Sequence, residues 1–235
     1  MPLFLDASSL DEIAKYSKMG ILGGVTTNPT IMAHDGIRGV EAAKKRAKDI
    51  ARALRPLPVS IEIFTDGDRA KMLAQAKEFA SLADNINIKI TIHGPHGQPV
   101  YLDLVNELET KHGIRVNVTA MMSAQQGILA ALAGATYVSL FGGRINNMGY
   151  DACSEISKLR QFLDDFELKS QIIIGSTREA LNVIEWFNAG AHIVTVTPSL
   201  IETMLIHPYS KETVQMFLND AARITGKTGH SKRKR

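Results

Sequence analysis

Cysteine is nearly absent from this sequence, and long apolar runs are absent altogether. Cys153 is the only cysteine in 235 residues, which excludes an intrachain disulfide or a metal cluster built from several cysteines and suits a reducing compartment. No stretch approaches the roughly 20 apolar residues that a membrane-spanning helix needs, and Asp6 interrupts the apolar start "MPLFLDASSL". We therefore expect a cytoplasmic location, with neither export nor membrane insertion.

Positive charge is concentrated at the C-terminus. The formal net charge is +3, but five basic residues lie among the last nine, and without them the rest of the chain carries −2. These residues are Lys227, Lys232, Arg233, Lys234 and Arg235. Residues 226–235, "GKTGHSKRKR", have no apolar anchor, so we expect a basic flexible tail. The tail could contact nucleic acid, a membrane surface or nothing; contact with nothing is favoured, and nucleic-acid binding through the tail is the non-enzymatic alternative.

Short apolar runs alternate with amphipathic stretches along the rest of the chain. Strands are expected at 3–6, 23–27, 59–64, 86–91, 114–119, 136–140, 171–175 and 192–196. Helices are expected near 8–19, 38–54, 67–83, 99–112, 123–133, 150–166, 177–188 and 199–206. Eight strand–helix units at a spacing of roughly 30 residues predict an α/β fold of the (β/α)₈ TIM barrel type. We expect one domain over residues 1–225, and a doubly wound sheet is the alternative architecture.

One more helix is expected after the eighth unit, at about 210–225. Ser210 can cap it and Glu212 lies in its first turn. Its single apolar stripe consists of Val214, Phe217, Leu218, Ala221 and Ile224. Such a helix has no barrel strand to cover, so it would lie across the barrel mouth or against a neighbouring subunit.

Polar residues occupy one face of several expected strands, because side chains alternate between faces. In 86–92 the isoleucines share one face, and Asn87, Lys89 and Thr91 share the other. In a barrel the apolar face contacts the helices, so the polar face points into the lumen. The side chains expected to converge there, near the C-terminal ends of the strands, are Asp6, Glu62, Lys89, Thr119 and Ser139.

A lysine in a barrel lumen has a chemical meaning. Burial disfavours the ammonium form, and the neutral amine can attack a carbonyl to form a Schiff base. The alternative is a structural ion pair between Lys89 and Asp6 or Glu62. We favour the nucleophile, with the two carboxylates transferring protons at different steps, one at a substrate hydroxyl and one through a water held by Thr119.

Two later segments indicate a phosphate site. "SLFGGRINNMG" (139–149) is expected to be a glycine-rich loop with Arg144, and "IIIGSTREA" (172–180) brings Ser176 and Arg178 to the start of a helix. Exposed backbone N–H groups beside a guanidinium bind phosphate, and loops after strands seven and eight often do so in barrels. A phosphorylated substrate is therefore expected.

The chain resembles the transaldolase family in a series of motifs over nearly its whole length. They are "LFLDASSLDEI" at the N-terminus, "GGVTTNPTIMA" (23–33), the lysine in "INIKIT", "VNVTAMMSAQQ" (116–126) and "VSLFGGRI" (138–145). Length and the last helix are most similar to the small transaldolases and the related fructose 6-phosphate aldolases. The resemblance implies a class I enzyme that uses a Schiff-base lysine, no metal and no other cofactor.

The same resemblance implies roles for individual residues. Lys89 would form the Schiff base with a ketose phosphate, and Asp6 would handle the proton of a substrate hydroxyl. Glu62 and Thr119 would position the catalytic water. The substrate site would be formed by Thr27, Asn28, Ser139, Phe141, Arg144, Ser176 and Arg178. In this set Asn28 would hold donor hydroxyls, and Ser139, Arg144, Ser176 and Arg178 would surround the phosphate.

Three positions distinguish the subgroups. The aldolases typically carry glutamine in place of Glu62 and tyrosine in place of Phe141, and they lack the serine that matches Ser139. This chain has the transaldolase residue at all three positions, and a phenylalanine cannot hydrogen-bond the catalytic water as a tyrosine could. Transaldolase is therefore favoured over an aldolase that releases dihydroxyacetone.

The loop after the lysine departs from the family pattern. It reads "KITIHGPHGQP", with His93 and His96 where a shorter segment is usual. A metal site is not favoured, because no third ligand has an obvious spacing. The loop could change the acceptor sugar, which leaves a transaldolase of a specialised sugar pathway open. The resemblance further implies sugar-phosphate substrates, the pentose phosphate pathway and a pentamer or decamer held by the last helix.

Overall fold

The structure is a computed structural model that describes residues 2–64 and 67–226. Its eight strands are β1 (Leu3–Asp6), β2 (Gly24–Thr26), β3 (Val59–Glu62), β4 (Ile86–Thr91), β5 (Val116–Met121), β6 (Tyr137–Phe141), β7 (Gln171–Gly175) and β8 (Ile193–Val196). All neighbouring strands are parallel, and β8 pairs with β1 to close the barrel. This closure confirms the (β/α)₈ TIM barrel and excludes a doubly wound sheet.

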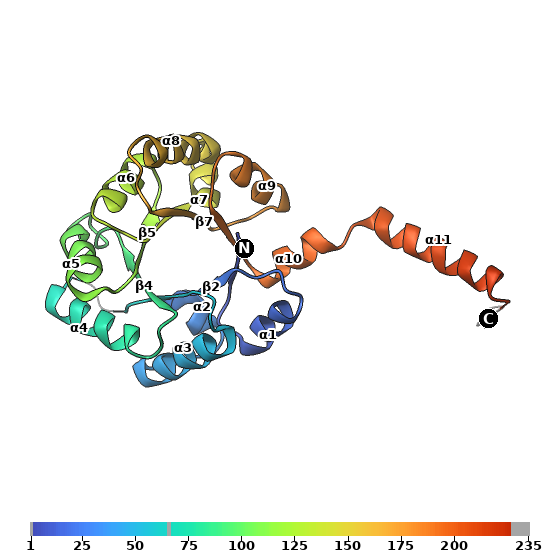
Figure 1. Cartoon of the computed structure of the whole chain (residues 1–235), viewed down its shortest axis with the longest axis horizontal. Coiled ribbons are helices and arrows are strands. Elements are labelled where there is room, and N and C mark those ends of the chain that lie inside the picture. The colour runs from blue at the N-terminus through green and yellow to red at the C-terminus, as the bar shows by residue number, and fades with distance from the viewer. Residues whose placement is uncertain (1, 65–66, 227–235) are drawn as a thin grey trace.

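Helices surround the barrel on the outside (Figure 1). Those that follow β1 to β4 are α1 (Leu10–Lys18), α2 (Pro29–His34), α3 (Val40–Leu54), α4 (Arg69–Ala80) and α5 (Leu102–His112). Those that follow β5 to β8 are α6 (Ala124–Leu132), α7 (Gly142–Asn147), α8 (Ala152–Asp165), α9 (Ala180–Asn188), α10 (Pro198–Leu205) and α11 (Pro208–Ile224). The last of these is the additional C-terminal helix that was expected.

Capping residues determine where several helices begin. Ser9 accepts a hydrogen bond from the Glu12 N–H, and Ser123 accepts one from the Gln126 N–H. A capping residue has a non-helical backbone, so α1 begins two residues later than expected and α6 one residue later. The sequence therefore predicted these helices correctly and their first residues less well.

Two short helices, α2 and α7, were not expected. Asn28 caps α2 through a hydrogen bond from the Ile31 N–H, and Pro29 is its first residue. The segment 142–147, which was expected to be a glycine-rich loop, is helical, and the loop prediction is wrong. Gly142 and Gly143 are buried and allow close packing there: a Cβ on Gly142 would lie 2.6 Å from the Trp186 ring.

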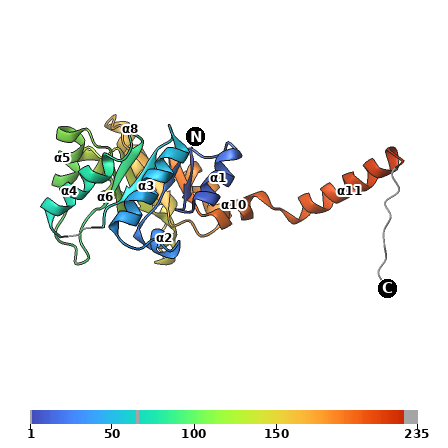
Figure 2. The same ribbon diagram turned by 90° about the horizontal axis from the view of Figure 1, so that it is seen from below.

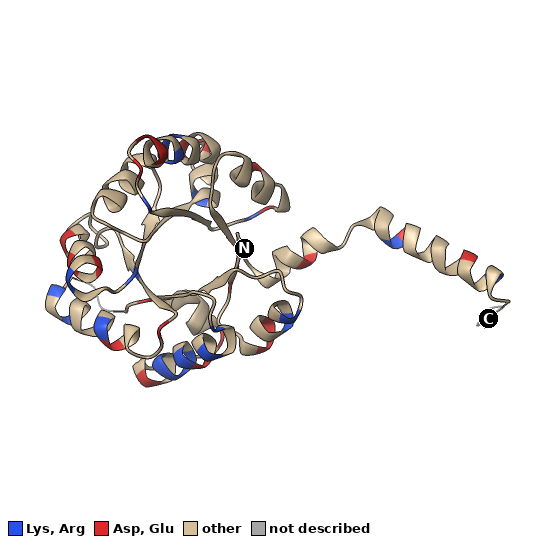
Figure 3. Ribbon diagram, viewed as in Figure 1, with Lys and Arg blue, Asp and Glu red and all other residues tan. Residues whose placement is uncertain are grey.

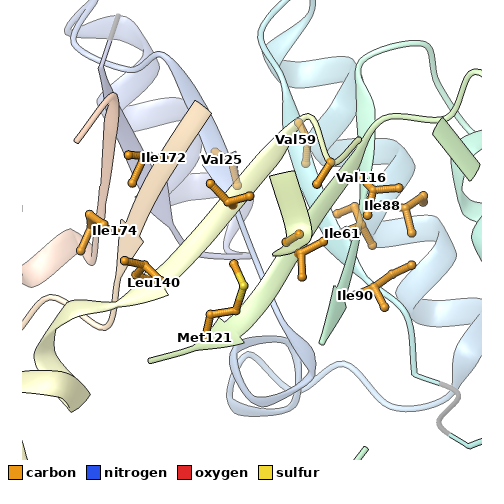
Figure 4. Close-up of a cluster of buried hydrophobic side chains, with 14 of the residues drawn as sticks. Val25, Val59, Ile61, Ile88, Ile90, Val116, Met121, Leu140, Ile172 and Ile174 are labelled. Atoms are coloured by element: carbon orange, nitrogen blue, oxygen red, sulfur yellow. The ribbon is translucent and has the colours of Figure 1, made fainter. Parts of the chain in front are cut away.

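The core lies between the barrel and the helices. Figure 4 shows apolar side chains of alternate strand positions gathered there, among them Val59, Ile61, Ile88 and Ile90. A second buried cluster, formed by Phe4, Tyr137, Ile173 and Ile193, fills the N-terminal part of the lumen. The lumen is therefore closed by apolar side chains at one end, and polar side chains occupy the other.

Helix α11 projects away from the barrel (Figures 1 and 2). None of its residues is buried, although all of them are described. The expected cap is wrong: His207, whose Nδ1 accepts from the Tyr209 N–H, precedes the helix, because Pro208 fixes the first turn two residues before Ser210. The expected position across the barrel mouth is therefore wrong, and the other expected position, against a neighbouring subunit, stays a prediction.

Charged residues lie mainly on the outer helices, with a run of basic residues on α3 (Figure 3). In the part of the chain that the structure describes, no helix is long and apolar enough to cross a membrane. The basic tail lies outside the described residues from Lys227 onward.

Candidate active site

A cavity of about 400 Å³ opens at the C-terminal ends of the barrel strands. Every predicted site residue except Thr27 contributes to its wall. These residues are Asp6, Asn28, Glu62, Lys89, Thr119, Ser139, Phe141, Arg144, Ser176 and Arg178. The alternation of side chains between strand faces, which predicted that five of them point into the lumen, is therefore correct about their position.

Lys89 lies in the middle of β4 and points into this cavity. Only 5% of the residue is exposed, and its Nζ lies 3.2 Å from Glu62 Oε2 and 3.3 Å from the backbone carbonyl oxygen of Thr27. The register pairs Glu62 of β3 directly with Lys89, which explains the ion pair. The amine is thus buried and held by two acceptors at the cavity wall.

Asp6, at the end of β1, lies on the other side of the same cavity. Its Oδ1 accepts a hydrogen bond of 2.7 Å from Thr26 Oγ1 of β2. Loss of hydration raises the pKa of Asp6, and this effect exceeds the lowering by the Lys89 charge and by the Thr26 hydrogen bond. A carboxyl group with a raised pKa is suited to exchange protons with a substrate.

The motif "VTTNP" contributes to the site in a different way from that expected. Thr27 is fully buried and is not part of the cavity wall; it offers Lys89 its backbone carbonyl, and Thr26 lines the cavity instead. Asn28 uses its Oδ1 to cap α2, which fixes its amide and leaves Nδ2 as a donor. Thr27 is thus a predicted substrate-site residue that the structure does not bring to the cavity wall.

Glu62 and Thr119 face the cavity from β3 and β5. Thr119 is 1% exposed, and within the described chain its Oγ1 is buried without a hydrogen-bond partner. A buried hydroxyl usually has a partner, and an ordered water can be that partner. These two side chains are therefore placed where a polar molecule in the cavity could bind both.

Ser139 of β6 donates its hydroxyl hydrogen to Asn117 Oδ1 at 2.7 Å, and Asn117 Nδ2 donates to Ser60 Oγ at 3.1 Å. All three side chains are buried. The serine hydroxyl is thus directed into the barrel, and it would have to turn in order to donate to a bound phosphate.

Two guanidinium groups lie at the opposite rim from Asn28. Arg144 comes from α7, with its guanidinium carbon 5.1 Å from the centre of the Phe141 ring, and Arg178 comes from the loop after β7. Ser176 in that loop has a positive φ of 59°. A Cβ on Gly143 would lie 1.9 Å from the Ser176 backbone oxygen, so only glycine lets α7 approach this loop.

Comparison with known proteins identifies the family of this chain. The model of a protein family described as "Transaldolase/Fructose-6-phosphate aldolase" matches residues 3–233. The chain belongs to this family. A "Probable transaldolase 2" of Listeria monocytogenes is 37% identical over 231 residues, 98% of this chain and all of that protein. A "Probable transaldolase" of Carboxydothermus hydrogenoformans is 36% identical over 225 residues, 94% of this chain and 97% of that protein.

Solved structures of lower identity share the fold alone. A thiamine phosphate pyrophosphorylase from Pyrococcus furiosus has a TM-score of 0.59 at 10% identity, covering 83% of this chain and 85% of that one. A flavocytochrome b2 has a TM-score of 0.61 at 13% identity, and this chain spans 58% of its length. Both support the barrel and say nothing about the reaction of this family member.

Among the residues that sequence reasoning missed are Thr26 and Thr195 of the cavity wall, and Asn117, which accepts a hydrogen bond from Ser139. Asn117 was on the predicted polar face of its strand, and Thr195 alternates with Val194 and Val196, so parity could have identified both. In the described part of the chain no three acidic, histidine or cysteine side chains are grouped as a metal site would require. His93 and His96 are not part of the cavity wall.

Proposed function

We propose that this family member is a transaldolase. It would move a dihydroxyacetone unit from a ketose phosphate, such as sedoheptulose 7-phosphate or fructose 6-phosphate, to an aldose phosphate, as in the pentose phosphate pathway. The observation that carries the proposal is the buried Lys89 amine beside Glu62 in a cavity that also holds two arginines. The family and the names of its relatives support it. The single cysteine favours a reducing cytoplasm.

The first half-reaction starts at Lys89. Its Nζ attacks the ketone carbon, and loss of water gives a protonated imine. Asp6 takes the proton of the substrate hydroxyl, the adjacent carbon–carbon bond breaks, and its electrons pass into the imine to leave an enamine. The aldose phosphate departs. The acceptor aldehyde then reacts with the enamine, Asp6 returns the proton to the new hydroxyl, and water held by Glu62 and Thr119 hydrolyses the imine.

The phosphate end of the substrate would bind between Arg144 and Arg178. Guanidinium groups form charge-assisted, paired hydrogen bonds with phosphate oxygens. Ser176 lines the same cavity, in the loop that Gly143 approaches closely. Asn28, at the other end of the cavity, would donate its Nδ2 hydrogens to donor hydroxyls.

The variant Gly143→Ala tests the phosphate end. A Cβ at this position would lie 1.9 Å from the Ser176 backbone oxygen and 2.9 Å from Arg178 Cγ, so the loop must move. We expect kcat/KM for phosphorylated substrates to fall on the order of 10²-fold, the scale of a displacement of about 1 Å. Steady-state kinetics with phosphorylated and unphosphorylated donors measures this decrease. The decrease in kcat/KM should be much smaller for the unphosphorylated donor.

Gly127→Ala is the matched control, because the atoms nearest its Cβ belong to the Leu159 side chain, at 2.5 Å, and neither residue lines the cavity. It should lower stability and leave the preference for phosphorylated donors unchanged. An equal loss for both donors in Gly143→Ala would argue against a phosphate site at this rim.

A trapping experiment tests the reaction itself. Borohydride added together with fructose 6-phosphate should reduce the imine and fix a covalent adduct on Lys89, and a panel of ketose phosphates would identify the preferred donor. Mass spectrometry of the digested protein locates the adduct. An adduct elsewhere, or none with any donor, would show that the proposed mechanism is wrong.

The second candidate is a fructose 6-phosphate aldolase that releases dihydroxyacetone, and Phe141 favours the transaldolase over it. Its ring contacts the Arg144 guanidinium and carries no hydroxyl to protonate the enamine through water. We expect Phe141→Tyr to increase dihydroxyacetone release in the absence of an acceptor by about tenfold or more. Enzymatic detection of free dihydroxyacetone measures it. High release by the unmodified enzyme would instead favour the aldolase.

A transaldolase of a specialised sugar pathway is the remaining alternative, because the loop with His93 and His96 after β4 departs from the family pattern. Nucleic-acid binding through the basic tail is not favoured, because the site geometry supports sugar-phosphate chemistry.

We propose further that α11 joins copies of the chain into a pentamer or decamer. Its apolar side chains Val214, Phe217, Leu218 and Ile224 are more than half exposed in the single chain. A contiguous exposed apolar stripe of this kind is typical of a surface that binds another protein chain. A chain that ends at Ile206 should keep the folded barrel and give smaller species, as measured by light scattering together with circular dichroism. A monomeric full-length protein would remove the proposal.

A further inference from the structure

Two threonines and Asp6 form a chain of hydroxyl contacts across three strands. Thr26 Oγ1 on β2 lies 2.7 Å from Asp6 Oδ1 on β1 and 2.6 Å from Thr195 Oγ1 on β8. Thr26 is 2% exposed and Thr195 is 5% exposed, and both contribute to the cavity wall. β1 pairs with both β2 and β8, so the contacts are held by the barrel itself.

The direction of donation along this series of hydrogen bonds follows from counting hydrogens. A threonine hydroxyl has one hydrogen to donate, and an ionised carboxylate has none. Thr26 gives its hydrogen to Asp6, so in the contact between the two threonines Thr195 must be the donor. Thr195 therefore donates to Thr26, and Thr26 donates to Oδ1 of Asp6.

We propose that Thr195 is a positioning residue for Asp6 in the proposed reaction, on whose correctness this inference rests. Because the hydrogen bond from Thr26 holds Oδ1, the plane of the carboxylate is set. Oδ2 is then the oxygen that exchanges protons. In cleavage, the proton moves from the substrate hydroxyl to Oδ2 while the electrons of the broken carbon–carbon bond enter the imine. In transfer, the proton returns from Oδ2 to the oxygen of the acceptor aldehyde.

The hydrogen bonds donated by Thr195 and Thr26 also favour the ionised form of Asp6. A hydrogen bond to the charged form lowers a carboxyl pKa, and a second donor strengthens the first by polarising it. Loss of the Thr195 hydroxyl should therefore raise the pKa of Asp6, and loss of the Thr26 hydroxyl should raise it further. The other ionisable side chains of the cavity wall are Glu62, Lys89, Arg144 and Arg178, and none of them is altered in these variants.

The test compares Thr195→Val, which keeps the shape and removes the hydroxyl, with Thr195→Ser, which keeps the hydroxyl. Single-turnover release of the aldose phosphate measures cleavage, and borohydride trapping measures imine formation at Lys89, which does not need Asp6. We expect Thr195→Val to cleave about tenfold more slowly, with normal trapping, and the acid limb of its pH–rate profile to move to higher pH. Thr195→Ser should restore the cleavage rate and the position of the acid limb. Thr26→Val should move the acid limb further than Thr195→Val.

The control is Thr203→Val on α10, which removes a hydroxyl that donates to the Ser199 carbonyl oxygen outside the cavity. It should leave the rate and the pH–rate profile unchanged. If Thr195→Val fails to fold, Thr195→Ala takes its place in the comparison with Thr195→Ser. An unchanged acid limb with normal trapping overturns the role of Thr195, whereas absence of trapping in the unmodified enzyme overturns the proposed function.

Discussion

Replacing Lys89 with methionine is expected to abolish turnover and borohydride trapping together. The side chain is similar in length and fits a buried site, but it cannot form an imine. Loss of a covalent nucleophile lowers kcat by a factor on the order of 10⁵ or more. Trapping followed by mass spectrometry, alongside a coupled assay of aldose phosphate release, measures both losses.

Lys158→Met is the matched control for this experiment. Lys158 also pairs with a carboxylate, at 2.8 Å from Glu155, but on the exposed surface of α8. It should retain activity and trapping. Circular dichroism should show that Lys89→Met is folded, since the methionine also removes a buried positive charge. Residual turnover of more than a few per cent in a folded Lys89→Met protein would mean that Lys89 is only the ion-pair partner of Glu62.

The barrel and the position of Lys89 were predictable because they depend on local periodicity. Alternation in β4 separates the isoleucines from Lys89, and a closed parallel barrel leaves only the lumen for the polar face. The same rule places Thr26 in the lumen and Thr27 beyond the end of β2. The resemblance to the family, in contrast, implied Thr27 for the substrate site, and the structure leaves this residue outside the cavity wall.

The remaining differences depend on contacts between distant segments. Adjacent glycines predict a loop, yet Gly143 is required in a helix because the Ser176 carbonyl, far along the chain, approaches it. The direction in which α11 leaves the barrel was not predictable either, because an apolar stripe contains no information on which surface it will face. Local patterns determine the elements, and the packing of distant segments determines how closely and in which direction they meet.

The second large effect is expected from Asp6→Asn. Asparagine keeps the shape of the side chain but cannot accept the hydroxyl proton, so cleavage should slow by about 10²- to 10⁴-fold, the contribution of a general base. Imine formation should continue, because it depends on Lys89. Borohydride trapping at nearly normal levels together with lost cleavage would separate the two roles.

The same substitution should stabilise the fold at neutral pH. The pKa of Asp6 is raised in the folded state from 3.8, so between 3.8 and the raised value the folded protein binds more protons than the unfolded chain. The free energy of unfolding therefore falls as pH rises through that window, and the ionised carboxylate costs stability above it. The asparagine side chain in Asp6→Asn is a neutral amide at every pH, so the unfolding midpoint in denaturant should rise at pH 8 and change little at pH 4.

Asp103→Asn is the control with the opposite expected sign. Arg69 Nε lies 2.6 Å from its carboxylate and holds the pKa of Asp103 below its usual range, so the ionised form stabilises the fold above that range. Removal of this charge should lower the unfolding midpoint at pH 8 and leave catalysis intact, because Asp103 lies on α5 outside the cavity wall. If Asp6→Asn lowers the midpoint as Asp103→Asn does, the attraction between Asp6 and Lys89 outweighs the loss of hydration. In that case Asp6 stabilises the barrel, and the raised pKa that suits it to proton transfer is not present.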